Sequence, residues 1–528
     1  MYVNRGQWFF GDEWDFLANR STTIGDDGVL QPHNEHWSTT PILIYGLLFR
    51  MVGLTSYAPY VAVLVATHLV VVHLIWRVML RGGIAPWVAT AFSAAFIPFG
   101  PGAENLLWAF QVGFVGAVAL GLAGILIADR PSASPRRVMA GWGVSVLSLT
   151  FSGIAVPLAG ATAVTAWMRR GVKAFLLVAS VPAAVYVAWL AATGVSAVPG
   201  PRPTPESLRV FHQFFGRSVG AVLSLGTSSA LAGAVLLVLG LAAIGLRRRR
   251  AGSFPEALVA AALGWVFLLL IVSVGRAPLG LDAAEATRYV YVGGALLLPV
   301  LVLGISDLVR HRIARVLVVA ALAAPWGAHN ALLLMRTADR QAEKEGLIRE
   351  QLVAAGTLFD RDAVLRYMPD PVFSPDLDLG ELDELLPSFP TGVVPERAAV
   401  IRAATALQVS LSTSAEFDAS PPISSIRSEY ASLTPQPDGC VVSTAALPVG
   451  RVLVPSGPAS SVRVTPTEQM AVELFLASRS SWAAYRDRME VLAGRPLFLD
   501  LAIDRNIVGD VTVVLRFPGT VTICPLGG

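Results

Sequence analysis

Charged residues are scarce in this chain, and lysine is almost missing. Of its 528 residues only 15% are charged and 54% are hydrophobic, and the only lysines are Lys173 and Lys344. A soluble globular chain of this length does not need so much apolar sequence. The composition therefore excludes an ordinary soluble protein for most of the length.

Histidine is also unevenly spread, since none follows His329. The serines of the C-terminal part consequently have no histidine within the same region. Serine–histidine catalysis confined to that region is excluded.

Apolar stretches of about 20 residues, enough to cross a bilayer core, recur through the first two thirds of the chain and stop near Met335. We predict a membrane domain over residues 1–335 and a soluble domain over 336–528. The spans at 84–100, 138–151 and 154–168 are short. The ten predicted spans are 57–80, 84–100, 108–128, 138–151, 154–168, 172–193, 226–246, 256–275, 289–308 and 313–335.

Arginines mark alternate loops between these spans. Basic residues near span ends are retained in the cytoplasm, so the other loops, and everything after residue 335, are predicted to be extracytoplasmic. The net charge of +3 belongs to the inner loops and does not indicate nucleic-acid binding. The inner residues are Arg81, Arg130, Arg136, Arg137, Arg169, Arg170, Lys173, Arg247 to Arg250, Arg310, Arg312 and Arg315.

The start of the chain conflicts with this topology. Residues 1–37 are expected outside, yet neither a signal peptide nor a span precedes them. We therefore expect that a first transmembrane helix is missing through a late assigned start. Segment 38–56 is apolar but carries Arg50, which predicts a helix lying in the outer interface.

Acidic residues gather in the outer loops. If the first cluster is helical, Asp12 and Asp15 share one face and Glu13 points away, so two carboxylates could hold a substrate hydroxyl or a cation. Solvated acids with a helix cap are the alternative. Glu35 and His36 have a spacing that permits divalent metal ligation, with plain hydrogen bonding as the alternative.

Two further outer loops carry candidate site residues. Glu104 sits in a short turn close to the hydrocarbon, where it either has a functional role or caps a helix. Arg288 and Tyr289 follow at the mouth of a span, with Arg276 earlier in the same loop. Guanidinium groups and a tyrosine hydroxyl suit a phosphate, while anchoring of Arg288 in the headgroup region is the alternative.

The soluble domain begins with a charged helical stretch at 339–352, where Glu345 and Arg349 have the spacing of an ion pair on a solvated face. A Pro-rich acidic run follows at 369–395. From about residue 440, short β-rich pieces alternate with Gly and Pro, which is typical of a β-sandwich. The predicted pieces are 440–444, 451–454, 461–464, 497–503, 510–517 and 520–524. Cys440 and Cys524, the only cysteines, lie in this external region. We predict a disulfide between them, with two separate buried thiols as the alternative.

The membrane domain resembles the GT-C superfamily of polyprenyl-phosphate-sugar glycosyltransferases, including actinobacterial arabinofuranosyltransferases. The similarity lies in the acid pair of the first outer loop, the motif Glu35-His36-Trp37, and the interfacial segment from Pro41 to Tyr57. It covers residues 8–335 as architecture, but only residues 10–60 and 285–291 as motif. The absent first span and the segment from His33 to His36, which replaces a basic loop of several relatives, depart from the family.

This resemblance implies an inverting sugar transfer from a polyprenyl-phosphate donor to a cell-envelope acceptor, on the outer face of the cytoplasmic membrane. Asp12 matches the family's general base, with Asp15 in reserve. Arg288, Arg276 and Tyr289 would bind the donor phosphate, and Glu13, Glu35, His36 and Glu104 would position substrate or a metal. A divalent cation (Mg²⁺, Mn²⁺ or Ca²⁺) stays open, with Glu35 and His36 as candidate ligands.

Two other classes of function compete with this interpretation. A transporter or flippase for lipid-linked glycan would also be polytopic, but transporters place ionisable groups at mid-membrane. Here His68 and His73 are five residues apart and not on a single face, which favours core hydrogen bonding over a proton relay. A surface protein that is only anchored would need a single span.

Overall fold

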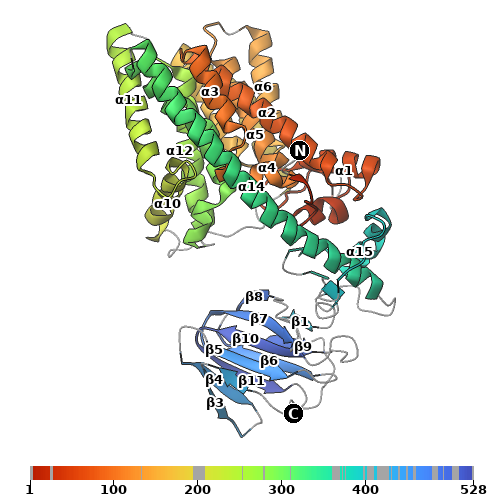
Figure 1. The fold of residues 1–528 in the computed structure, drawn as a ribbon. Coiled ribbons are helices and arrows are strands. Elements are labelled where there is room, and N and C mark those ends of the chain that lie inside the picture. Colours follow the sequence, from red (N-terminus) through yellow and green to blue (C-terminus); the bar gives the residue numbers. More distant parts are fainter. Residues whose placement is uncertain are drawn as a thin grey trace. The chain divides into compact units, whose positions relative to one another are not determined.

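The computed structural model resolves the chain into two compact units (Figure 1). The first comprises Met1–Gln7, Arg20–Val52 and Tyr57–Ala342, and the second Trp8–Asn19, Gly53–Ser56 and Glu343–Gly528. The described residues are 4–23, 28–132, 134–193, 209–251, 254–277, 280–309, 311–358, 369–370, 373–374, 376–396, 399–400, 403, 409–412, 427–429, 431–437, 440–446, 450–455, 460–478, 486–491, 493–501 and 511–525.

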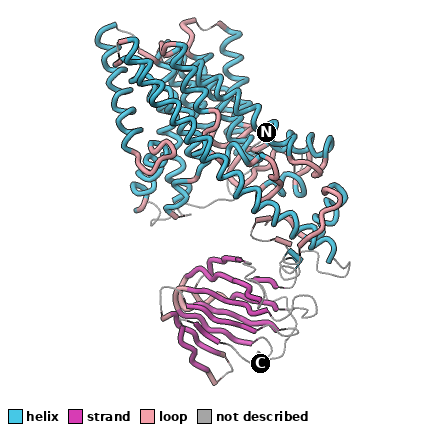
Figure 2. The backbone as a smooth tube through the Cα atoms, in the orientation of Figure 1, coloured by secondary structure: helices cyan, strands magenta, loops and turns pink. Residues whose placement is uncertain are grey.

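The first unit is helical (Figure 2). Each of the ten predicted spans overlaps a helix, and segment 38–56 contains α1. The main helices are α1 (Thr39–Val52), α2 (Ala58–Arg81), α3 (Pro86–Phe96), α4 (Glu104–Leu107), α5 (Val112–Ala128), α6 (Pro135–Leu149), α7 (Ala155–Arg170), α8 (Val172–Thr193), α10 (Phe211–Leu223), α11 (Leu231–Ala251), α12 (Glu256–Arg276), α13 (Thr287–Leu308) and α14 (Arg312–Leu358).

Seven helices within the described residues are long and apolar enough to cross a membrane, which indicates a multi-pass membrane protein. They correspond to α2, α5, α8, α11, α12, α13 and α14. The other three predicted spans correspond to helices of 11, 15 and 16 residues, α3, α6 and α7. These are shorter than the roughly 20 residues that a simple crossing needs.

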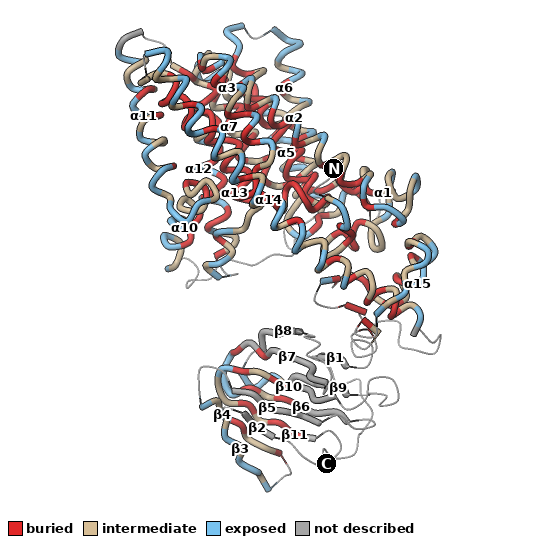
Figure 3. Tube along the Cα trace, in the orientation of Figure 1, coloured by how far each residue is buried: buried red, intermediate tan, exposed pale blue. Residues whose placement is uncertain are grey.

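Helix α13 forms the centre of the first unit, and its residues from Tyr289 to Ser306 are all buried (Figure 3). Glycine permits the close approach of a neighbouring helix: a Cβ on Gly240 of α11 would overlap the carbonyl oxygen of Val300. Alanine at that position would have to push the two helices apart.

Ion pairs hold the arginine-bearing ends of several helices together. Buried Asp129, which follows α5, accepts from Arg81 Nε at 2.9 Å and pairs with Arg169 Nη2 at 2.8 Å. Arg169 also pairs with Glu256 at 2.9 Å, and Arg247 pairs with Asp307. These arginines therefore bind helices to one another in addition to any topological role.

The second unit combines a small helical part with two antiparallel sheets. In the helical part, Trp8 packs against Trp14 and Phe389 with ring centroids 5.7 and 5.0 Å apart. The backbone N–H of Trp8 donates to the fully buried Glu345 carboxylate at 2.7 Å. Helix α15 (Leu379–Leu385) begins with a capping box formed by Asp378 and Glu381.

The strand order is β1-β9-β6-β11-β4-β3 in one sheet and β2-β5-β10-β7-β8 in the other. Buried residues from both sheets, such as Val464, Ile523, Val472 and Leu515, form apolar cores. The strands are β1 (Val409–Ser412), β2 (Arg427–Glu429), β3 (Ala431–Pro435), β4 (Val441–Ala445), β5 (Gly450–Pro455), β6 (Ser460–Pro466), β7 (Met470–Ser478), β8 (Arg486–Val491), β9 (Leu497–Leu501), β10 (Val511–Phe517) and β11 (Thr520–Pro525).

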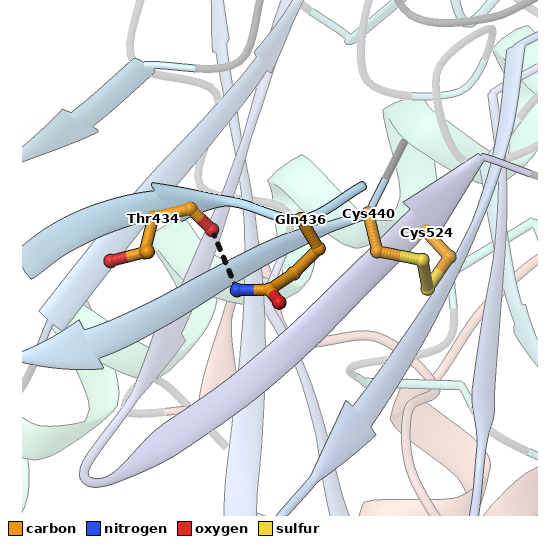
Figure 4. The surroundings of a disulfide bond; sticks show 4 residues. All are labelled: Thr434, Gln436, Cys440 and Cys524. Carbon is orange, nitrogen blue, oxygen red and sulfur yellow. Dashed lines mark hydrogen bonds between the residues drawn. A yellow bond between two sulfur atoms is a disulfide. The ribbon is translucent and has the colours of Figure 1, made fainter. Parts of the chain in front are cut away.

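The predicted disulfide is confirmed: Cys440 and Cys524 are bonded (Figure 4). Cys524 belongs to β11 and Cys440 immediately precedes β4, its neighbour in the sheet. The carbonyl of Cys440 also accepts the N–H of Gln436 at 2.8 Å. The bridge closes a loop between positions 84 residues apart and ties the last strand to the start of β4.

Candidate functional site

A tight turn fixes the positions of Glu35 and His36 in the first unit. The N–H of His33 donates to the carbonyl of His36 at 3.0 Å, and the N–H of His36 donates to the carbonyl of His33 at 2.9 Å. Asn34 has a φ of +49°, a left-handed conformation that Asn adopts more readily than most residues. The backbone of this turn therefore sets the direction of both side chains.

Glu35 forms an ion pair with Arg276, the last residue of α12. The two side chains keep 31% and 19% of their exposure, so the pair is within reach of a ligand. His36 Nε2 lies 3.6 Å from the same carboxylate oxygen. A guanidinium group binds carboxylate and phosphate with similar geometry, so an incoming phosphate would compete with Glu35 for Arg276.

These side chains line a cavity of about 360 Å³, which we call the Glu35 cavity. Its volume lies within the range of about 300–1,000 Å³ found for small-molecule sites. Its polar lining is Glu35, His36, Tyr186, Arg276 and Tyr289. Its apolar lining is Ile154, Val156, Pro157, Leu268, Ile271 and Val272. A polar group beside an apolar wall suits an amphipathic ligand.

Aromatic contacts extend this cavity toward Arg288. The rings of His36 and Phe114 meet edge to face at 5.8 Å, and Phe114 lies 6.2 Å from Tyr289. The Arg288 guanidinium lies over the Tyr289 ring at 5.4 Å. The sequence-predicted residues Glu35, His36, Arg276 and Tyr289 thus line one cavity, and Arg288 packs against its rim.

Glu104 is bound to the first turn of α13. Its carboxylate accepts from Thr287 Oγ1 at 2.9 Å, from the Arg288 N–H at 3.1 Å and from Arg288 Nη1 at 3.1 Å. A negative charge at a helix N-terminus is favourable. Glu104 therefore caps α13, a helix far away in the sequence, rather than the helix that follows it directly, and it also neutralises Arg288.

Gly153 contacts the histidine of the cavity directly. A Cβ at this position would lie 2.8 Å from His36 Nδ1, closer than real side chains approach. We expect Gly153→Ala to displace the imidazole and to cost about 1–3 kcal/mol of stability, as overpacking does. The histidine's NMR signals in selectively labelled protein, recorded beside those of Gly143→Ala, measure this.

The control shows the effect of a glycine-to-alanine change without steric crowding, because a Cβ at Gly143 would meet nothing within 4 Å. Unchanged His36 signals in Gly153→Ala, together with unchanged stability, would show that the histidine is not held by this contact.

The acids of the first cluster belong to the second unit. Glu13 is fully buried and accepts the N–H of Phe10 at 3.0 Å, so it has a structural partner there. Asp12 is half-buried, and Asp15 begins a short π-helix, Asp15–Asn19. The first cluster therefore belongs to a different unit from Glu35, Arg276 and Arg288.

Asp15 lies in an acidic environment. Burial raises the pKa of the Glu381 carboxyl, the N–H of Asp378 opposes this effect, and the charges of Asp378, Asp376 and Asp15 raise the pKa further. The Asp15 carboxylate therefore acts electrostatically on Glu381.

The geometry gives little support to a metal at Glu35 and His36. No group of three or more His, Cys, Asp or Glu side chains that could hold a metal ion occurs within the described residues. Glu35 is also already paired with Arg276. Within the part of the chain that the structure describes, the two side chains therefore lack a third His, Cys, Asp or Glu that would complete a metal site.

Sequence reasoning missed Tyr186 and Gly153 as site residues. Tyr186 is a polar-tipped residue in an otherwise apolar span, and that contrast was a usable signal. Gly153 gave none, because its role depends on contact with a side chain over 100 positions away.

Of the two histidines of α2, His68 is hydrogen-bonded within the fold. His68 Nδ1 lies 2.9 Å from Tyr291 Oη, and its Nε2 lies 2.9 Å from the Ile97 carbonyl. The prediction of core hydrogen bonding is confirmed for His68 and is wrong for His73, which is exposed.

Comparison with known proteins identifies no relative. No protein-family model, no curated protein and no solved structure matches the chain.

Proposed function

We propose that the protein is a membrane glycosyltransferase that moves a sugar from a polyprenyl-phosphate donor to a cell-envelope acceptor. The observation that carries this proposal is the Glu35 cavity, where Arg276 and two tyrosines adjoin an apolar wall supplied by α7 and α12. A lipid phosphate has the same two parts, a charged group and a hydrocarbon chain. The resemblance of the sequence to the GT-C superfamily supports the same ligand class.

In this proposal Arg276 exchanges Glu35 for the donor phosphate. Its guanidinium can bind two phosphate oxygens at once, and Tyr289, which lines the same cavity, can supply a hydroxyl donor. Arg288 stays bound to Glu104 and packs against Tyr289 at the rim of the cavity. Positive charge held close to a leaving phosphate stabilises the transition state as the sugar–oxygen bond breaks.

The general base is proposed from the resemblance alone: Asp12, with Asp15 as the second candidate. The base removes the proton of the acceptor hydroxyl, the hydroxyl oxygen bonds to the anomeric carbon, and the bond from that carbon to the phosphate oxygen breaks. Attack from the opposite face inverts the anomeric configuration. Polyprenyl phosphate leaves with the bonding electron pair.

The test is transfer of labelled sugar from polyprenyl-phosphate donors to cell-envelope acceptors by the full-length protein in membranes. Asp12→Asn is expected to lower the transfer rate by about a hundredfold to ten-thousandfold, the usual contribution of a general base. Asp282→Asn is the matched control, because Asp282 is a fully exposed acid that pairs with Arg217 at 3.3 Å.

Each outcome has a distinct meaning. Loss of transfer in Asp15→Asn but not in Asp12→Asn assigns the base to Asp15. Movement of lipid-linked glycan across the membrane without a new glycosidic bond replaces the transferase with the transporter.

A further inference from the structure

A second cavity, of about 330 Å³, opens between α11, α13 and α14. Leu322 on its wall is 39% exposed, so the cavity is a crevice at the surface of the first unit. We call it the α11–α14 crevice. Its apolar walls include Leu236 of α11, Leu298, Leu301 and Ile305 of α13, and Ala321 and Leu322 of α14.

Polar groups gather at one end of the crevice. There Trp326 Nε1 donates to the Leu225 carbonyl at 3.1 Å, and His329 Nε2 donates to the Gly226 carbonyl at 2.8 Å. Leu225 has a φ of +53°, which is strained for a bulky residue and persists where the surroundings enforce it. The two side-chain bonds from α14 hold the turn in this conformation at the mouth of the crevice.

The length of the crevice matches one leaflet of a bilayer. Ala321 and His329 both line it, and at 1.5 Å per helical residue they are about 12 Å apart along α14. Half of a hydrocarbon core is about 15 Å. The whole crevice is therefore close to the depth of the hydrocarbon of a single leaflet, and its polar groups lie at one end, as in a lipid.

The chemistry of the lining excludes charged ligands. No Asp, Glu, Lys or Arg lines the crevice among the residues that the structure describes. Water inside it would find few polar partners along the leucine walls. Both α11 and α14 are candidate spans with mostly unburied residues, so hydrocarbon is the medium around them.

We propose that the α11–α14 crevice binds one acyl chain of a membrane phospholipid, with the glycerol end of the lipid at Trp326 and His329. This site shares no lining residue with the Glu35 cavity and does not depend on the proposed transferase activity. The bound chain fills the gap between α14 and α11.

The experiment uses full-length protein in nanodiscs that contain phosphatidylglycerol with a photoreactive diazirine in one acyl chain. After irradiation, mass spectrometry of the digested protein measures labelling of the peptides that contain residues 298–305 and 321–329. Labelling there is expected to exceed that of the lipid-facing helix α8 at least severalfold. Equal labelling of α8 and the crevice would reduce the site to ordinary lipid contact and overturn the proposal.

Ala321→Trp is expected to fill the crevice and to lower its labelling to the level of α8. Ala320→Trp is the matched control, because Ala320 is an exposed neighbour that does not line the crevice. Leu236→Trp blocks the opposite wall and replaces Ala321→Trp if that variant does not fold. Undiminished labelling in a folded blocking variant contradicts the proposal. So does labelling by a photoreactive polyprenyl phosphate in the absence of phospholipid labelling.

Discussion

Glutamine in place of Arg276 is expected to weaken the binding of polyprenyl phosphate by about ten- to 150-fold. The reason is the loss of a charge-assisted hydrogen bond, which contributes about 1.5–3 kcal/mol. Binding of the lipid to full-length protein in nanodiscs, followed by microscale thermophoresis, measures the change. Arg217→Gln serves as the control, because Arg217 pairs with exposed Asp282 and does not line the Glu35 cavity.

Glu35→Gln is expected to change the affinity in the opposite direction. Glu35 holds the guanidinium that the phosphate needs, so removing its charge frees Arg276 and removes repulsion of the anion. A gain of about tenfold corresponds to roughly 1.4 kcal/mol. If both variants bind more weakly than wild type, Glu35 itself contacts the ligand. That result would contradict the proposal that the Glu35 carboxylate and the phosphate compete for Arg276.

Removal of the disulfide is expected to destabilise the sheets of the second unit by about 4 kcal/mol. The loop between Cys440 and Cys524 spans 84 positions. A bridge across a loop of this size lowers the conformational entropy of the unfolded chain, and this stabilises the folded state relative to it. The comparison is between wild type and the double variant Cys440→Ala, Cys524→Ala.

The measurement is pulse proteolysis of the full-length chain in increasing urea, followed at fragments from the C-terminal region. A multidomain membrane protein does not unfold in a single two-state transition, so the unfolding of the sheets has to be followed separately from that of the helices. Wild type under reducing conditions is the control and is expected to behave like the double variant. A urea midpoint that is the same for oxidised wild type and the double variant would show that the bridge adds no stability.

The positions of the long apolar helices in the first unit were predictable, because a run of about 20 apolar residues has the length needed to cross a bilayer core. The end of α14 was not. The charges from Asp339 onward indicated a new element, yet α14 continues unbroken from Arg312 to Leu358. Charged residues indicate that this part of the helix lies in water rather than in the membrane, but they do not interrupt the backbone hydrogen bonds of a helix. No proline or glycine interrupts α14 near Met335.

The burial of Glu345 was also not predictable from the sequence. Glu345 and Arg349 have the spacing of an exposed helical pair, and a solvated face was predicted for them, but Glu345 is fully buried and accepts the Trp8 N–H. That prediction was wrong. Spacing along one helix shows which residues share a face, whereas burial of that face depends on a segment over 300 positions earlier in the chain.

The strand β7 was missed in a different way. Met470, Val472, Leu474 and Leu476 alternate with other residues over Met470–Ser478, but Glu473 and alanines dilute the pattern. The pairing of β7 with β10 from Glu473 to Ser478 supplies the missing information. Strand formation here depends on a distant partner more than on local preference.

The members of the Glu35 cavity were named from the sequence, but their pairing was not. Loop positions identified Glu35, His36, Arg276 and Tyr289 as candidates. The sequence could not show that Arg276 pairs with Glu35 or that Arg288 pairs with Glu104, because each pair joins residues over 180 positions apart. It also grouped Asp12 with these residues, whereas the fold assigns Asp12 to the second unit.

The two acid–arginine pairs make the region around the cavity electrically balanced before any ligand arrives. Glu35 offsets Arg276 and Glu104 offsets Arg288. A phosphate entering this region adds uncompensated negative charge in a partly dehydrated space, which is costly. If the proposed function holds, phosphate binding is therefore expected to be accompanied by uptake of a proton or of a counter-cation, so that the occupancy of the site follows the ionic conditions at the membrane surface.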